Sequence, residues 1–252
     1  MSFAVEHLSP RDSLIARFDP RWKLVALLIA AVLTLLLRSP TLLLIALTVT
    51  LSLVGVARLP GAWYRVRIVA LLFALAPFAL FLPLTFDQGP SWRWAGLSFH
   101  REGFNAAGIL IIRGVAVVSL MLVLLGTAPL HATARAARAL GCPGTLVQIF
   151  LMSYRYIFLL LDELNRLRVA LRVRGFRNRA NRHSYRTAGQ AIGTLIVRGA
   201  DRAERVAHAM RCRGFDGHYR ALAEFHTRPI DLLLTALITA PFIALTIMDR
   251  CT

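Results

Sequence analysis

The chain has 252 residues, of which 57% are apolar, and its mean hydropathy is +0.59. This composition excludes an ordinary soluble domain, a disordered tail, a secreted disulfide scaffold and a typical soluble DNA-binding domain. Lys and Arg exceed Asp and Glu by 17, yet only 17% of the residues are charged, so the basic residues must be confined to particular stretches. We therefore expect a membrane protein.

Five apolar stretches are long enough, or nearly so, to cross a bilayer as helices. They cover Trp22–Leu37, Thr41–Ala57, Ile68–Phe86, Phe104–Leu130 and Leu232–Met248. The first begins at Asp19 and Pro20, where Asp can cap exposed helix N–H groups and Pro suits the first helical position. Pro77 and Pro83 predict a kink in the third stretch.

The distribution of basic residues predicts the orientation of these spans. With the N-terminus in the cytoplasm, 25 of the 30 basic residues fall on the cytoplasmic side. Those on the outer side are Arg38, Arg93, Arg101 and Arg250. The outer loop also carries Trp92 and Trp94, whose rings favour the headgroup layer. We expect a cytoplasmic N-terminus and an outer C-terminus.

The remaining basic residue, Arg113, falls inside the fourth apolar stretch. An ionised group within a span is costly and suggests a functional role. Arg113 could pair with Glu102 or Asp87, face a partner subunit, or extend its side chain toward an interface.

A large basic insertion, residues 131–229, separates the first 130 residues from a last span in residues 230–252. Thr145–Arg174 contains no Gly or Pro and predicts one helix of 30 residues, and a second helix is expected at about Tyr185–Arg213. The apolar part, Leu146–Leu161, is either an embedded or interfacial helix or a sixth span. The expected fold class is an all-α integral membrane protein, with about five transmembrane helices and long cytoplasmic helices between the fourth and fifth.

Both long helices are expected to end in the same short sequence. The segment Ala170–Phe176 recurs 39 residues later as Ala209–Phe215, with five of seven positions identical. The candidate site residues are Arg172, Arg174, Gly175, Phe176, Arg211, Arg213, Gly214 and Phe215. One interpretation is a pair of ordinary helix stops, with Gly in the left-handed conformation and Arg in the last turn. The other is a pair of equivalent docking ends for a dimeric partner, whose carboxylates or carbonyls the guanidinium groups would bind.

These sequences resemble the transmembrane T component of energy-coupling factor (ECF) ABC transporters, and within it the cobalt/nickel type CbiQ. The opening Asp19-Pro20-Arg21-Trp22-Lys23-Leu24 is similar to the family's Asp-Pro-Arg-x-Lys-Leu. The repeated helix ends are similar to its paired Ala-Arg-Gly motif, although Val173 and Cys212 replace the alanine.

The resemblance implies a non-catalytic subunit of an ATP-driven cobalt or nickel importer in the bacterial cytoplasmic (inner) membrane. Its implied partners are a pair of cytoplasmic ABC ATPases, which carry ATP and Mg, and a substrate-binding membrane subunit. This chain is then expected to hold no catalytic, cofactor or metal site, and it contains no phosphate-binding G-x-x-x-x-G-K-[ST] loop. The resemblance does not distinguish identical from different ATPases.

The His and Cys residues show no spacing typical of a metal site or a disulfide framework. They are His7, His100, His131, His183, His208, His218, His226, Cys142, Cys212 and Cys251. Two other classes of function remain as alternatives: a basic membrane-tethered scaffold that binds nucleic acid or anionic lipid, and a lipid-modifying membrane enzyme. A scaffold of the first class needs no repeated helix end. An enzyme of the second class would need a cluster of carboxylates, which the insertion of this chain lacks.

Overall fold

The computed structural model describes residues 18–85, 91–94, 97–177, 179–217 and 229–251 of the chain. Helices account for nearly all of this part, and one short hairpin of two strands accompanies them. The elements are α1 Pro20–Leu36, α2 Pro40–Val56, α3 Gly61–Thr85, β1 Ser91–Trp94, β2 Leu97–His100, α4 Arg101–Thr127, α5 Leu130–Ala139, α6 Gly144–Val173, α7 Arg182–Cys212 and α8 Pro229–Cys251. The all-helical fold class is confirmed, and each of the five expected spans corresponds to a helix: α1, α2, α3, α4 and α8.

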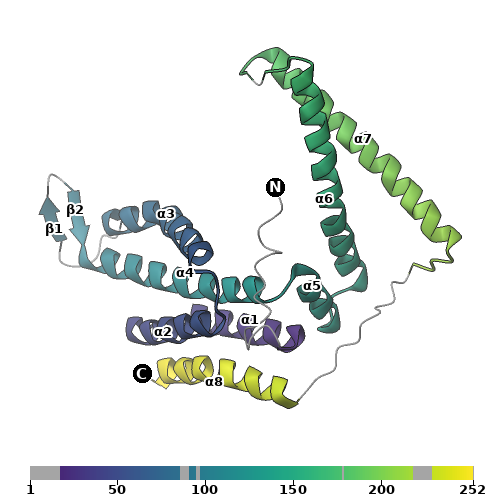
Figure 1. Ribbon diagram of the computed structural model, residues 1–252. Helices are drawn as coiled ribbons and strands as arrows, with labels where there is room; N and C mark the ends of the chain where they lie inside the picture. The colour runs from purple at the N-terminus through teal and green to yellow at the C-terminus, as the bar shows by residue number, and fades with distance from the viewer. Residues whose placement is uncertain (1–17, 86–90, 95–96, 178, 218–228, 252) are drawn as a thin grey trace. The chain divides into compact units, whose positions relative to one another are not determined.

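The chain divides into two compact units, and the first is a helix bundle. It comprises Met1–Gly141 and Phe225–Thr252, and the second comprises Cys142–Glu224. In the first unit α4 packs against α1, α2 and α3, while α8 packs against α1 and α2 (Figure 1). The core is built from Leu27, Leu43, Leu120 and Phe242, all fully buried. Small residues on α1, such as Ala30, let neighbouring helices approach closely.

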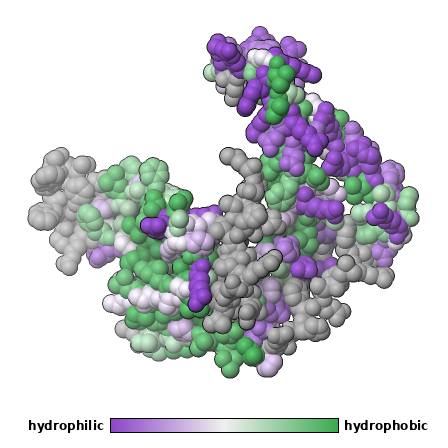
Figure 2. Space-filling view, in the orientation of Figure 1, coloured by the Kyte–Doolittle hydropathy of each residue, from purple (hydrophilic) through white to green (hydrophobic). Residues whose placement is uncertain are grey.

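Helix length and composition identify the chain as a multi-pass membrane protein. In the described part, four helices are long and apolar enough to cross a membrane: α3, α4, α6 and α8. The helices α1 and α2 have 17 residues each, or about 26 Å, which is near the lower limit for a span. Hydrophobic residues gather over the bundle, whereas hydrophilic residues gather over α7 and the α6–α7 turn (Figure 2). The bundle therefore presents to its surroundings the apolar surface that lipid requires.

A strand hairpin and a short helix of the first unit were not expected from the sequence. Between α3 and α4, β1 and β2 form an antiparallel hairpin with Trp92 opposite Phe99. The side chains of the strands, and Asp87, lie outside the described residues. After α4, the short helix α5 packs against α1. The helix α3 continues through Pro77 and Pro83. Gly103 on α4 packs closely against the backbone of Pro83, so that a Cβ added to Gly103 would lie 2.5 Å from the Cα of Pro83.

The second unit consists of α6, α7 and the turn between them. The two helices diverge from the turn as the arms of a V (Figure 1). Glu163 on α6 forms a salt bridge with Arg198 on α7, and a Cβ added at Gly199 would lie 3.9 Å from Leu160. At the start of α7, the buried Ser184 hydroxyl accepts a hydrogen bond from the backbone N–H of Arg179, in the turn, at 3.3 Å. The turn and the salt bridge join α7 to α6.

Candidate functional site

The two copies of the repeated sequence form helix ends that share a pair of hydrogen bonds after the last helical residue. At the end of α6, the N–H of Gly175 donates to the Arg172 carbonyl at 3.1 Å, and the N–H of Phe176 donates to the Leu171 carbonyl at 3.0 Å. At the end of α7, the corresponding bonds, from Gly214 to Arg211 and from Phe215 to Met210, measure 3.0 and 3.1 Å. This pattern defines a Schellman motif, in which the last carbonyls of the helix are satisfied by the turn that follows it.

Glycine is required in both motifs by the backbone conformation. Gly175 has φ +79° and Gly214 has φ +76°, in the left-handed region that residues with a Cβ adopt only at a cost. A Cβ at either position would meet nothing within 4 Å, so conformation rather than crowding selects glycine. The interpretation of both sequences as helix stops is thus confirmed for their geometry.

The exposure of the side chains is also the same in the two copies. Leu171 and Phe176 are half-buried in the first copy, as are Met210 and Phe215 in the second. The residues between them are exposed in both copies: Arg172, Val173, Arg174 and Gly175, and Arg211, Cys212, Arg213 and Gly214. Val173 is 82% exposed, so its departure from alanine disturbs no packing within the chain. We term these two ends, residues 171–176 and 210–215, the knobs, and each presents two exposed guanidinium groups.

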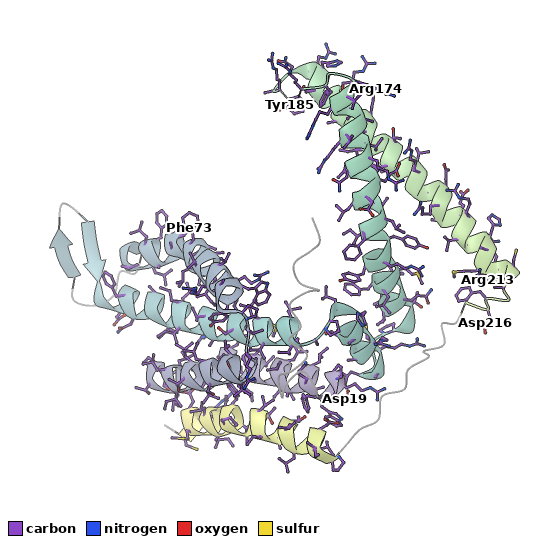
Figure 3. All side chains as sticks on the ribbon, viewed as in Figure 1. Asp19, Phe73, Arg174, Tyr185, Arg213 and Asp216 are labelled. Carbon is purple, nitrogen blue, oxygen red and sulfur yellow. The ribbon has the colours of Figure 1, made fainter. Side chains whose placement is uncertain are left out.

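The two knobs lie at opposite ends of α7. Arg174 lies beside the turn into α7, near Tyr185, whereas Arg213 and Asp216 lie where α7 ends (Figure 3). The helix α7 has 31 residues, which corresponds to about 46 Å. A single pocket on a partner cannot accept both knobs, and two separate pockets can.

A groove of about 1010 Å³ lies between α6 and α7 within the second unit. Its α6 wall is largely apolar and includes Met152 and Ile157, while α7 contributes Arg198, Arg202 and Arg205. The helix α6 thus carries exposed apolar residues, such as Ile149, which is 56% exposed.

Arg113 contacts the end of another helix in the bundle. Its guanidinium donates to the Leu37 carbonyl, where α1 ends, at 2.6 Å. Arg113 is half-buried, and Glu102, one of the partners expected from the sequence, is exposed on the same helix. The described contact therefore joins α4 to the end of α1, and a further role for Arg113 stays a prediction.

Sequence reasoning missed a cluster of buried charged residues at one end of the bundle, which we term the anchor cluster. It consists of Asp19, Lys23, Asp231 and the backbone carbonyl of Thr127. Lys23 is 1% exposed and donates to that carbonyl, at the last residue of α4, at 3.1 Å. The Asp19 carboxylate accepts from the backbone N–H of Arg21 at 3.0 Å, while the Asp19 N–H donates to the Asp231 carboxylate at 3.4 Å. The cluster joins α1, α4 and α8.

A second carboxylate holds the other end of α8. Asp249 accepts hydrogen bonds from the backbone N–H groups of Arg38 and Ser39 at 2.8 and 3.0 Å, and from the Ser39 hydroxyl. Because Asp231 meets the start of α1 and Asp249 meets its end, α8 runs parallel to α1. An acidic residue at the edge of an apolar span usually has a partner, so the sequence indicated that Asp231 and Asp249 are paired but not with which residues.

The described residues contain no group of three or more His, Cys, Asp or Glu side chains able to hold a metal ion. His131, His183 and His208 are exposed, whereas His7, His218 and His226 and the side chain of His100 lie outside the described residues. The three cysteines are free.

The chain is similar in sequence to known proteins over most of its length. The family model of the cobalt transport protein CbiQ matches residues 11–223. The energy-coupling factor transporter transmembrane protein EcfT of Limosilactobacillus fermentum is 24% identical, over 92% of this chain and 93% of that protein. The cobalt transport protein CbiQ of Rhodobacter capsulatus is 29% identical, over 69% of this chain and 67% of that protein. The EcfT protein of Staphylococcus aureus is 23% identical, over 84% and 83% respectively.

Proposed function

The chain belongs to the cobalt transport protein family CbiQ, whose members are non-catalytic membrane components of transporters, and on that premise we propose that it couples ATP hydrolysis by partner subunits to metal import. In this proposal two cytoplasmic ABC ATPases bind ATP and Mg, and a separate membrane subunit binds the substrate, cobalt(II) or nickel(II). The N-terminus lies in the cytoplasm, and the protein resides in the bacterial inner membrane.

The observation that carries the proposal is the pair of equivalent knobs at the ends of α6 and α7. Their two Schellman hydrogen bonds, left-handed glycines and exposed arginines occupy equivalent positions. Two unrelated helix stops need not resemble each other in this way, whereas two knobs that bind equivalent sites on a dimer must. Since α7 places the knobs about 46 Å apart, each knob would bind a different ATPase subunit.

The chemistry of each knob suits a groove lined by carboxylates or carbonyl groups. Arg174 and Arg213 each lie at the residue that caps the helix and are exposed, so their planar guanidinium groups can bind a carboxylate through two parallel hydrogen bonds. The Schellman turn holds the knob in one conformation before docking, which reduces the entropy lost on binding. When ATP binding brings the ATPases together, the knobs would move with them, and the long helices would carry the motion to the membrane bundle.

The double variant Arg174→Glu with Arg213→Glu tests the proposal. We expect it to remain in the membrane and to lose its ATPases on co-purification, because both guanidinium contacts are replaced by repulsion. The matched control is Arg166→Glu with Arg186→Glu, which makes the same change of charge at exposed positions of the same two helices. Equal recovery of ATPase with the two double variants would contradict the proposal.

A second measurement tests whether both knobs are needed for transport. Each single variant, Arg174→Glu or Arg213→Glu, is expected to lose ATP-driven cobalt(II) uptake in vesicles almost as completely as the double variant. The reason is that a coupling unit held at one knob transmits little of the relative motion of the two ATPases. Near-normal uptake by either single variant would show that one knob suffices.

A further inference from the structure

The anchor cluster lies where the chain passes between the two units. Thr127, whose carbonyl Lys23 holds, is the last residue of α4, and only α5 separates it from the second unit. Asp231, which accepts the Asp19 N–H, is the third residue of α8, where the chain has returned from the second unit. Both covalent routes between the units therefore begin beside residues that the cluster fixes to α1.

Stability alone does not explain this choice of residues. Asp19, Lys23 and Asp231 are 9%, 1% and 6% exposed, and removing charged groups from water is costly even when they are paired. Apolar side chains of similar size often stabilise a buried site as well or better. What the charged groups provide is a set of directed bonds to chosen backbone groups, from Lys23 to the carbonyl at the end of α4 and from Asp231 to the N–H at the start of α1.

We propose that the anchor cluster is the fixed point of the coupling mechanism, with Lys23 and Asp231 as positioning residues. The inference rests on the proposed function, because it concerns how motion of the second unit reaches the bundle. Lys23 closes the last turn of α4, and Asp231 joins the first turn of α8 to α1. A displacement of the second unit that reaches the end of α4 or the start of α8 then moves these helices as a whole, because their end turns are held and do not unwind.

The physical basis is that the end turns of a helix unwind at a lower cost in free energy than its middle turns. The last four carbonyl groups of a helix lack partners within it, and end turns open at little cost in free energy. The Lys23 ammonium supplies a strong charged donor to one such carbonyl and also interacts favourably with the negative end of the α4 dipole. The Asp231 carboxylate, in the first turn of α8, interacts favourably with the positive end of that helix.

The opposite end of α8 offers a matched control. There Asp249 accepts hydrogen bonds from Arg38 and Ser39, and it likewise joins α8 to α1. This contact lies on neither of the two connections between the units, which fall at residues 141–142 and 224–225. Loss of the Asp249 contacts therefore removes a comparable bond without touching the routes of coupling.

The experiment compares Lys23→Met, Asp231→Asn and Asp249→Asn in the complete transporter, reconstituted in vesicles with its ATPases and substrate-binding subunit. Radiolabelled cobalt(II) uptake and ATP hydrolysis are measured on the same samples, and co-purified ATPase is quantified. We expect Lys23→Met and Asp231→Asn to retain their ATPases and hydrolysis while uptake per ATP falls by about tenfold, a size common for coupling between sites. Asp249→Asn is expected to keep the wild-type ratio, and Asp231→Glu, which retains the carboxylate, is expected to recover part of it.

The ratio of uptake to hydrolysis separates coupling from simple destabilisation. If Lys23→Met and Asp231→Asn lower uptake and hydrolysis in parallel with loss of assembled complex, the cluster is only structural and the inference is wrong. It is also wrong if the ratio stays at the wild-type value, or if Asp249→Asn lowers it equally. Should Lys23→Met fail to assemble, Asp231→Asn decides alone. Failure of the wild-type chain to bind ATPases would instead refute the proposed function, and the inference with it.

Discussion

Replacing the glycines of the two knobs by alanine tests whether the shape of each helix end matters for docking. Gly175 and Gly214 have φ +79° and +76°. An alanine in this region costs about 1–2 kcal/mol. No other atom lies within 4 Å of the added Cβ in either knob, so steric overlap adds nothing to that cost. The whole effect is therefore on the conformation of the helix end.

The penalty should appear in the affinity for the ATPases. Because helix ends open with free energies near zero, a cost of about 1–2 kcal/mol shifts the ratio of closed to open ends by about 5- to 30-fold. If docking requires the closed end, each substitution weakens binding at its knob by a similar factor. Titration of purified ATPase onto the reconstituted complex measures it, and hydrogen exchange at the Phe176 N–H, bonded to the Leu171 carbonyl at 3.0 Å, reports opening directly.

Two further variants act as controls. Gly175→Asn places in the same turn a residue that tolerates the left-handed conformation, so it should bind more tightly than Gly175→Ala. Gly189→Ala lies inside α7, where a Cβ meets nothing within 4 Å, and should leave docking unchanged while it stabilises the helix by about 1 kcal/mol. Equal affinity for wild type and for the variant with alanine at both knobs, together with unchanged exchange, would refute the reasoning.

Three predictions concern stability, each measured as the shift in thermal unfolding of the purified chain. Leu120→Ala removes a fully buried side chain of the bundle core and should cost about 2–5 kcal/mol. Gly126→Ala places a Cβ 2.4 Å from the Leu59 side chain, and the resulting overpacking should cost about 1–3 kcal/mol. Glu163→Gln breaks the salt bridge to Arg198, whose side chain is 53% exposed, and should cost no more than about 1 kcal/mol.

The sequence predicted the helices and the geometry of their ends because both depend on local features. The long apolar runs mark α1, α2, α3, α4 and α8, and the absence of Gly and Pro from Thr145–Arg174 predicts α6. In each knob, a glycine after the last helical arginine predicts a left-handed turn, and both turns are found. The use of these ends for docking stays a prediction, because it concerns a partner.

The contacts that escaped prediction join residues far apart in the chain. Lys23 and the Thr127 carbonyl are separated by 104 residues, and Asp19 and Asp231 by 212. A basic residue at the start of an apolar span could equally have extended toward water, and nothing local indicates which carbonyl it meets. The Asp-Pro-Arg-Trp-Lys sequence is recognisable as a helix start, whereas its second role, binding α4 and α8, emerges only from packing.

The closed helix ends follow from what a coupling protein must transmit. An extended residue spans about 3.3 Å and a helical residue about 1.5 Å, so each unwound residue adds about 1.8 Å of slack. One opened turn of roughly four residues thus absorbs about 7 Å, enough to take up a substantial displacement at a docking site. The Schellman turns close the C-terminal ends of α6 and α7, and the anchor cluster joins the end of α4 and the start of α8 to α1. In the proposed mechanism these ends determine how much of the ATPase motion reaches the membrane, because a stiff helix transmits displacement only when both of its ends are held.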